Sequence, residues 1–174
     1  MANLILSALY FMLPAYAANM APVFAHILRL PFGSPVDKKH LGSHKTFRGI
    51  YAAYIAALIV LWIQRFIQKQ GYWESMHLLD YEELSILLLA FCFGIGAITG
   101  DMVKSFFKRL LKIKPGSPWF PFDQIDYVIG ALVFLSPVYI IDWKHAATLL
   151  LITPMLNIIV NALGYVLRLK KVWW

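Results

Sequence analysis

The chain has 174 residues, of which 60% are hydrophobic and only 14% are charged, and its mean hydropathy is +0.66. Soluble domains average about 45–50% apolar and about 25% charged residues. This composition excludes a disordered chain, a nucleic-acid-binding tail and an ordinary soluble enzyme, and it indicates one integral membrane domain over residues 1–174. The lone cysteine, Cys92, lies in an apolar run, which excludes an internal disulfide and a cysteine-based zinc site.

Charged residues divide the chain into apolar stretches. No Lys, Arg, Asp or Glu precedes Arg29, and the later stretches without such residues are 49–64, 84–100, 127–141 and 145–167. A helix needs about 20 residues to cross the hydrocarbon core, so the three shorter stretches must include flanking polar residues or line a protected cavity. We therefore predict an all-α integral membrane protein with five transmembrane helices. These are 4–26, 48–67, 82–103, 124–141 and 146–167.

The basic residues are distributed unevenly between the two sides that five spans create. Segments 27–48, 104–123 and the C-terminal tail hold 13 of the 16 Lys and Arg residues. Because positive loops stay in the cytoplasm, we predict an N-terminus outside the cell membrane and a cytoplasmic C-terminus. Ala15-Tyr16-Ala17 has the small-x-small pattern of a signal-peptide cleavage site, but no basic residue precedes the apolar run, so we expect the first helix to be retained.

The first basic loop, 33–49, combines glycines and serines with Lys45, Thr46 and Arg48. Backbone amides in such a loop can bind phosphate oxygens, and basic side chains add charge. The spacing of a Walker P-loop is absent, so the pattern fits an ordinary basic loop equally well.

Asp101 ends the third predicted span, and Lys104, Lys108 and Arg109 follow it. Spacings of three and four place Asp101, Lys104 and Lys108 on one helical face. An acidic side chain so close to the hydrocarbon is costly, which favours a functional role over an ion pair that merely ends a transmembrane helix.

Asp123 and Asp126 lie three residues apart at the start of the fourth predicted span. Two carboxylates near phosphate-binding bases suit Mg²⁺, which takes a few carboxylates together with water and substrate phosphates. Equally, acidic residues cap and stabilise a helix N-terminus, so the spacing alone leaves both interpretations open. Asn19, inside the first span, either supplies a polar group to a cavity or forms an interhelical hydrogen bond.

Longer strings join these clusters. They are Pro35-Val36-Asp37, Gly42-Ser-His-Lys45-Thr46-Phe-Arg48-Gly49, Gly100-Asp101-Met-Val-Lys104-Ser105-Phe-Phe-Lys108-Arg109, Lys112-Ile-Lys114-Pro115-Gly116, Pro118-Trp119 and Phe122-Asp123-Gln124-Ile125-Asp126. Over nearly the whole chain this pattern resembles the CDP-archaeol synthase family, which is similar to the C-terminal part of bacterial CDP-diacylglycerol synthases. Lys104 stands where the bacterial pattern has Glu, Pro115 where it has Asp, and Phe120-Pro121-Phe122 replaces a Gly/His-rich stretch, which favours the archaeal type.

The resemblance implies a five-helix membrane domain whose two long cytoplasmic loops form a polar pocket. It implies a reaction in which CTP and a membrane lipid phosphate (2,3-bis-O-geranylgeranylglycerol 1-phosphate in archaea) give CDP-lipid and pyrophosphate, with Mg²⁺ as the cofactor. We expect no nucleic-acid ligand and no obligate protein partner. On this reading Asp101, Asp123 and Asp126 hold the metal and act in catalysis with Lys108 and Arg109. The residues expected to bind substrate are Asn19, Lys45, Thr46, Arg48, Lys104, Ser105 and Lys114.

The main alternative is a membrane protein that binds lipid phosphate or nucleotide without catalysis. CDP-alcohol phosphotransferases are disfavoured because their D-G-x-x-A-R pattern is missing. No Ser/His/Asp arrangement is visible along the sequence.

Overall fold

The computed structural model describes residues 2–114 and 117–166, and these residues form helices joined by loops, with no strand among them. A single isolated bridge pairs Pro35 with Thr46. The elements are α1 (Ala2–Ile27), α2 (Phe47–Lys69), a 3-10 turn (Glu74–Met76), α3 (Ile86–Ala90), a π-helical segment (Phe91–Ile95), α4 (Gly96–Leu110), α5 (Phe122–Leu135) and α6 (Trp143–Val166).

The helical fold class is confirmed, and a helix is found in the region of each predicted span. Three helical stretches are long and apolar enough to cross a membrane, namely Asn3–Ile27, Phe47–Lys69 and Ile86–Leu110. In the third stretch, α3, the π-helical segment and α4 follow one another without a break. The C-terminal tail and the end of the last predicted span, residue 167, lie outside the described residues.

Three predicted boundaries are wrong. The third helix begins at Ile86, after Ser85 at its N-cap, rather than at residue 82. The third helix ends at Leu110 rather than residue 103, so the chain stays helical through Lys104 and Lys108 instead of entering a loop. The fourth ends at Leu135 rather than residue 141, because Pro137 has no N–H to donate to Val133 O, which accepts a hydrogen bond from Ser136 Oγ instead. The segment 104–123 is therefore half helix and half loop.

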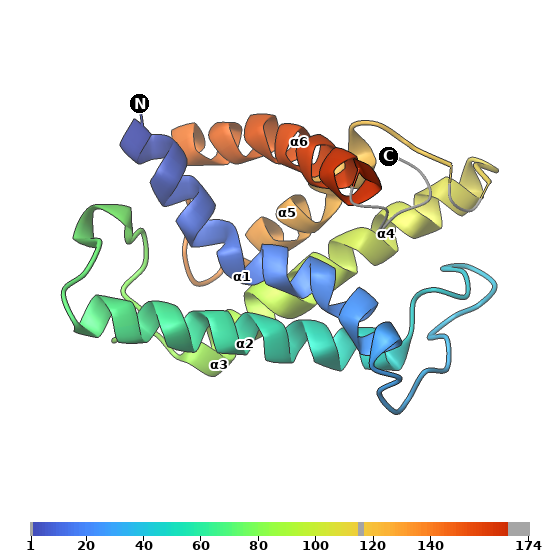
Figure 1. Cartoon of the computed structure of the whole chain (residues 1–174), viewed down its shortest axis with the longest axis horizontal. Coiled ribbons are helices and arrows are strands. Elements are labelled where there is room, and N and C mark those ends of the chain that lie inside the picture. The colour runs from blue at the N-terminus through green and yellow to red at the C-terminus, as the bar shows by residue number, and fades with distance from the viewer. Residues whose placement is uncertain (1, 115–116, 167–174) are drawn as a thin grey trace.

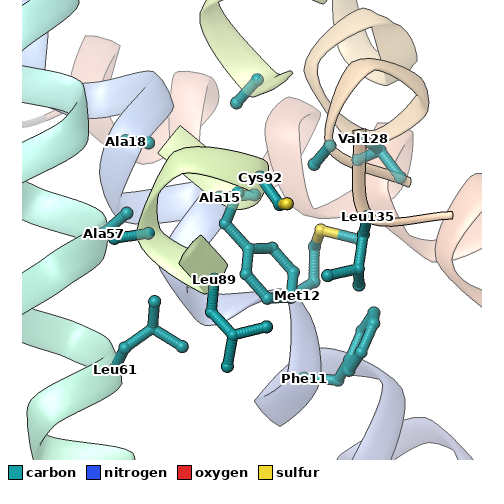
Figure 2. Packing of buried hydrophobic residues seen from close by; sticks show 14 of the residues in the cluster. Phe11, Met12, Ala15, Ala18, Ala57, Leu61, Leu89, Cys92, Val128 and Leu135 are labelled. Carbon is teal, nitrogen blue, oxygen red and sulfur yellow. The ribbon is translucent and has the colours of Figure 1, made fainter. Parts of the chain in front are cut away.

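The core lies where α1 crosses the other long helices. Figure 2 shows Phe11, Met12 and Ala15 packed against Leu89 and Leu135, and all five side chains are fully buried. Small residues along α1 and α2 allow close packing, which is the usual basis of helix association in lipid. In Figure 1, loop 28–46 and residues 111–114 and 117–121 lie at one end of the long axis, and loop 70–85 lies at the other. We call the first end the basic end.

Glycines bring α4 and α5 into backbone contact. A Cβ added at Gly96 would lie 2.8 Å from Gly130 O, and one added at Gly100 would collide with Asp126 O. One added at Gly130 would collide with Gly96 O. Only residues without side chains permit this approach, and it places the charged end of α4 directly beside the first turn of α5.

At the opposite end a polar chain joins α1 to α6. Ser7 Oγ lies 3.0 Å from His145 Nε2, and His145 Nδ1 contacts Asp142 Oδ2. The hydrogen bond to His145 holds the pKa of the exposed Asp142 carboxyl below its usual range. This spatial Ser/His/Asp arrangement was not expected from the sequence. Ser7 is buried and its hydroxyl donates to Asn3 O at 2.7 Å. The three residues therefore connect α1 to α6, and Ser7 does not have the surroundings of a nucleophile.

The α4–α5 contact predicts a graded response to added methyl groups. Gly100→Ala should lower the thermal stability in detergent, by about 1–3 kcal/mol for an overpacked core, and should separate the charged ends of α4 and α5. Gly49→Ala is the milder control, because its Cβ would lie 3.2 Å from Pro22 Cβ, which requires a shift of only a few tenths of an ångström. Equal melting temperatures for the two variants would contradict this account of the contact.

Candidate active site

The site is an ionic cluster at the basic end, built by three segments. Helix α4 contributes Asp101, Lys104 and Lys108, which recur every three or four residues and therefore share one face, as the sequence predicts. The first turns of α5 contribute Asp123 and Asp126. The loop before α2 adds one more cation, Lys45. The three carboxylates singled out from the sequence are thus brought together from separate stretches.

Lys104 lies at the centre of this cluster. Its ammonium nitrogen is 3.0 Å from Asp101 Oδ1, 3.1 Å from Asp123 Oδ1 and 2.8 Å from Asp126 Oδ2. Its side chain is 15% exposed and the Asp126 side chain only 5%. Buried charges are stable only when paired, so the most deeply buried of the three carboxylates, Asp126, depends on an ammonium group that it shares with Asp101 and Asp123.

Two further lysines complete the charge balance. Lys45 pairs with Asp101. Lys108 Nζ lies 3.0 Å from Asp123 Oδ2 and donates to Ser117 O at 2.6 Å. Asp123 also accepts a hydrogen bond of 2.6 Å from the backbone N–H of Trp119, while Pro121 rather than Asp123 occupies the N-cap position of α5. Asp123 is therefore not the N-cap of α5, although it lies in the first turn of that helix, where an acidic side chain is favourable.

The loop that carries Lys45 is closed by backbone hydrogen bonds. Val36 N donates to Lys45 O at 2.8 Å, and Arg48 N donates to Phe32 O at 2.9 Å. Thr46 caps α2 by accepting a hydrogen bond from Gly49 N. Farther out in the loop, hydrogen bonds from the backbone and ring of His40 lower the pKa of the Asp37 carboxyl.

Arg48 holds the base of this loop rather than the ionic cluster. Its Nη2 lies 2.6 Å from His26 Nδ1, at the end of α1, and its Nη1 contacts Leu30 O at 3.4 Å. A Cβ at Gly33 would lie 2.9 Å from the same guanidinium, so glycine leaves room for it. The arginine expected to bind substrate thus joins α1, the loop and α2.

The remaining predicted residues take varied positions. Ser105 is buried in α4 and its hydroxyl donates to Asp101 O at 2.8 Å. Arg109 donates to Ile113 O and lies near Gly42, away from the carboxylates. Lys114 is exposed in the loop after α4. Asn19 lines a cavity between α1, α5 and α6.

Cavities approach the cluster from two sides. One of about 530 Å³ lies between α4 and α5, with Lys104 and Asp126 at its polar end and mainly apolar walls. Another of about 500 Å³ includes Asn19, and it shares Asn157 and Asn161 with a smaller cavity that reaches Lys108 and Asp123. Asn157 donates to Tyr127 OH at 3.1 Å. Its position in an apolar helix at the far end of the chain gave no sequence signal for this site.

The donor chemistry of the cluster fits Mg²⁺ in one particular way. Carboxylate oxygens are the ligands that Mg²⁺ takes, at about 2.0–2.1 Å, usually together with water or substrate phosphates. Here three carboxylates surround a common ammonium at 2.8–3.1 Å, and within residues 2–114 and 117–166 no three His, Cys, Asp or Glu side chains are arranged to hold a metal by themselves. The cluster suits a metal whose ligand set is completed by phosphates.

Comparison with known proteins decides the family. The model of the CarS-like family, CDP-archaeol synthase, matches residues 1–174. The chain belongs to the CDP-archaeol synthase family. A CDP-archaeol synthase of Methanococcus maripaludis is 34% identical over 98% of this chain and 97% of its own length. That of Methanospirillum hungatei is 36% identical over 94% of this chain and 100% of its own.

A solved structure supports the same assignment. It is described as an intramembrane enzyme for archaeal membrane lipid biosynthesis, is 28% identical, and superposes with a TM-score of 0.71 over 90% of this chain and 94% of that one. The resemblance seen in the sequence is confirmed, and the chain is an enzyme of the CDP-archaeol synthase type.

The geometry of Arg48 predicts an indirect role in CDP-archaeol synthase activity. Arg48→Gln should reduce CDP-lipid formation by about tenfold, equivalent to about 1.4 kcal/mol, because Lys45 is less firmly positioned. His26→Gln should act through the same contact, so the double variant should be scarcely worse than Arg48→Gln alone. Rates measured for the two single variants and the double variant test this. Additive losses would contradict a shared positioning role.

Proposed function

We propose that this enzyme transfers CMP from CTP to the phosphate of a membrane lipid and releases pyrophosphate. The proposed acceptor is 2,3-bis-O-geranylgeranylglycerol 1-phosphate or a related archaetidic or phosphatidic acid, and the product is the CDP-lipid. The observation that carries the proposal is the partly buried cluster of three carboxylates and three lysines beside an apolar cavity. The family of CDP-archaeol synthases supports it.

We propose that five helices cross the cell membrane, with the N-terminus outside and the basic end in the cytoplasm. Both loops that flank the cluster lie at that end, and positive loops are retained on the cytoplasmic side. Helix α5 has only 14 residues, so its charged first turns would lie beneath the membrane surface, protected by α4 and α6. CTP would reach the cluster from the cytoplasm.

The lipid substrate would approach through the cavity between α4 and α5. Val103, Phe107 and Ile129 line this cavity, and Lys104 with Asp126 forms its polar end. An isoprenoid or acyl chain is compatible with the apolar wall, and the attached phosphate would then reach the ionic cluster. This arrangement places a lipid phosphate and a nucleotide phosphate on the same charged groups without bringing the lipid chains into water.

In the proposed reaction an oxygen of the lipid phosphate forms a bond to the α-phosphorus of CTP. The bond from that phosphorus to the oxygen that bridges to the β-phosphate breaks, and pyrophosphate leaves with the electron pair. A phosphate monoester is largely a dianion near neutral pH, since its second pKa is about 6, so no general base has to be found. The barrier is then mainly repulsion between anions, which positioned cations reduce.

The proposed role of each residue in phosphate binding or positioning follows from its place in the site. Lys45 and Lys108, at the two edges of the cluster, would bind phosphate oxygens that approach from either side. Arg109 and Lys114, nearer the loops, would bind the outer phosphates of CTP. Thr46 and Ser105 would act by fixing α2 and Asp101 through the hydrogen bonds they make. Mg²⁺, held by Asp101, Asp123 and Asp126 with substrate phosphates, would neutralise phosphoryl charge.

Labelled CTP tests the proposal. Purified protein with Mg²⁺ and a lipid phosphate should transfer label from the α-phosphate of CTP into lipid, while label from the γ-phosphate should appear as pyrophosphate. Asp123→Asn and Asp126→Asn should each lower transfer by about 100-fold or more, because loss of a carboxylate weakens the charge stabilisation that a metal supplies. Glu83→Gln, an exposed acid at the opposite end, is the matched control.

The alternative of binding without catalysis predicts a different result. Labelled CTP would be retained by the protein, no pyrophosphate would appear, and the lipid would stay unlabelled. Near-normal transfer by both aspartate variants would instead show that the reaction takes place away from the cluster. A panel of archaetidic and phosphatidic acids in the same assay identifies the lipid class.

A further inference from the structure

Lys104 has the contacts of a bound cation rather than of a residue at the edge of a site. Its nitrogen is within 3.1 Å of all three carboxylates. Asp126 is 8% exposed, and its Oδ2 lies 2.8 Å from that nitrogen. One cation thus lies among oxygens of three carboxylates, as a metal ion does in a carboxylate site.

The cluster is also balanced in formal charge. The three acids Asp101, Asp123 and Asp126 are paired with the three lysines Lys45, Lys104 and Lys108. A divalent cation that arrives alone finds no net negative charge, and it would have to displace an ammonium held by three partners. A divalent cation that arrives with nucleotide phosphates brings the compensating negative charge with it. The phosphates can then pair with Lys104 while carboxylate oxygens turn to the metal.

We infer that Lys104 is the protein's own substitute for a metal ion at the centre of the carboxylates, and that it makes divalent-cation binding depend on nucleotide. The inference rests on the proposed function only in taking nucleotide phosphates as the partners that draw Lys104 away. Lys104 thereby prevents the carboxylates from binding a metal ion before substrate arrives. It also reduces the electrostatic repulsion between the three carboxylates when no substrate is bound.

Mn²⁺ binding to the purified protein in detergent, followed by electron paramagnetic resonance without nucleotide, tests this inference without turnover. Lys104→Gln should bind about one Mn²⁺ per chain. Its affinity for Mn²⁺ should be about tenfold or more higher than that of the unmodified protein, since ligand charge sets the affinity of such sites. Lys104→Arg retains a cation and should bind as weakly as the unmodified protein. Lys112→Gln removes an exposed positive charge outside the cluster and controls for net charge.

Thermal unfolding provides a second readout. Lys104→Gln should melt at a lower temperature in EDTA than in Mn²⁺, because three carboxylates then lack their cation, whereas Mn²⁺ should leave the melting temperature of the unmodified protein unchanged. A folded Lys104→Gln protein that binds Mn²⁺ no more tightly than Lys112→Gln would overturn the inference. So would tight Mn²⁺ binding by the unmodified protein without nucleotide.

If Lys104→Gln fails to fold, Mn²⁺ binding to the unmodified protein tests the inference instead. Its affinity for Mn²⁺ should rise by about tenfold or more when the α,β-methylene analogue of CTP is present, within the usual range of coupling between two ligands. Equal Mn²⁺ affinity with the analogue bound would overturn the inference. If the analogue itself does not bind, the proposed function fails, whereas the Mn²⁺ affinities of the nucleotide-free variants still test the role of Lys104.

Discussion

The backbone contact between α4 and α5 is the constraint on which the site depends. Gly96, Gly100 and Gly130 leave no side chain between the two helices, so carboxylates from α5 come within ion-pair distance of lysines on α4. Helices in lipid gain little from burying apolar surface against one another, and close packing of small residues is what holds them together. The same feature that stabilises this helix pair therefore assembles its charged groups.

Under the proposed function, the ionic cluster is the part of this mostly apolar protein that would bind highly charged substrates. Isolated carboxylates at this depth would be costly, but each one here is paired, and the formal charges of the cluster cancel. An apolar cavity reaches the same groups from the side, between α4 and α5. If the proposed function holds, a nucleotide and a lipid phosphate would meet at this cluster without either substrate crossing an unfavourable environment.

Local spacing made much of this predictable from the sequence. Apolar length located the helices, and the spacing of Asp101, Lys104 and Lys108 placed them on one face of α4. The extension of α4 to Leu110 was missed because basic residues were taken to mark the end of a span, although lysine side chains can pair within the helix end. The family was recognisable from the charged motifs of this sequence, and the family model matches the whole chain.

Contacts between distant segments could not be read from spacing. Lys45 meets Asp101 across 56 positions, Ser7 meets His145 across 138, and Asn157 reaches the site from the last helix. Arg48 looked like a phosphate ligand by residue type, and only its contact with His26 shows that it holds the loop. Residue type gives the chemistry that a side chain can do, whereas tertiary packing decides where that chemistry is available.

A crystal structure of the protein with Mn²⁺ and the α,β-methylene analogue of CTP tests the central claim most directly. The account predicts an anomalous Mn²⁺ signal beside the carboxylates of Asp123 and Asp126, with the α-phosphorus facing the cavity between α4 and α5. Nucleotide and metal bound at the opposite end, near loop 70–85, or bound with the ionic cluster untouched, would contradict it.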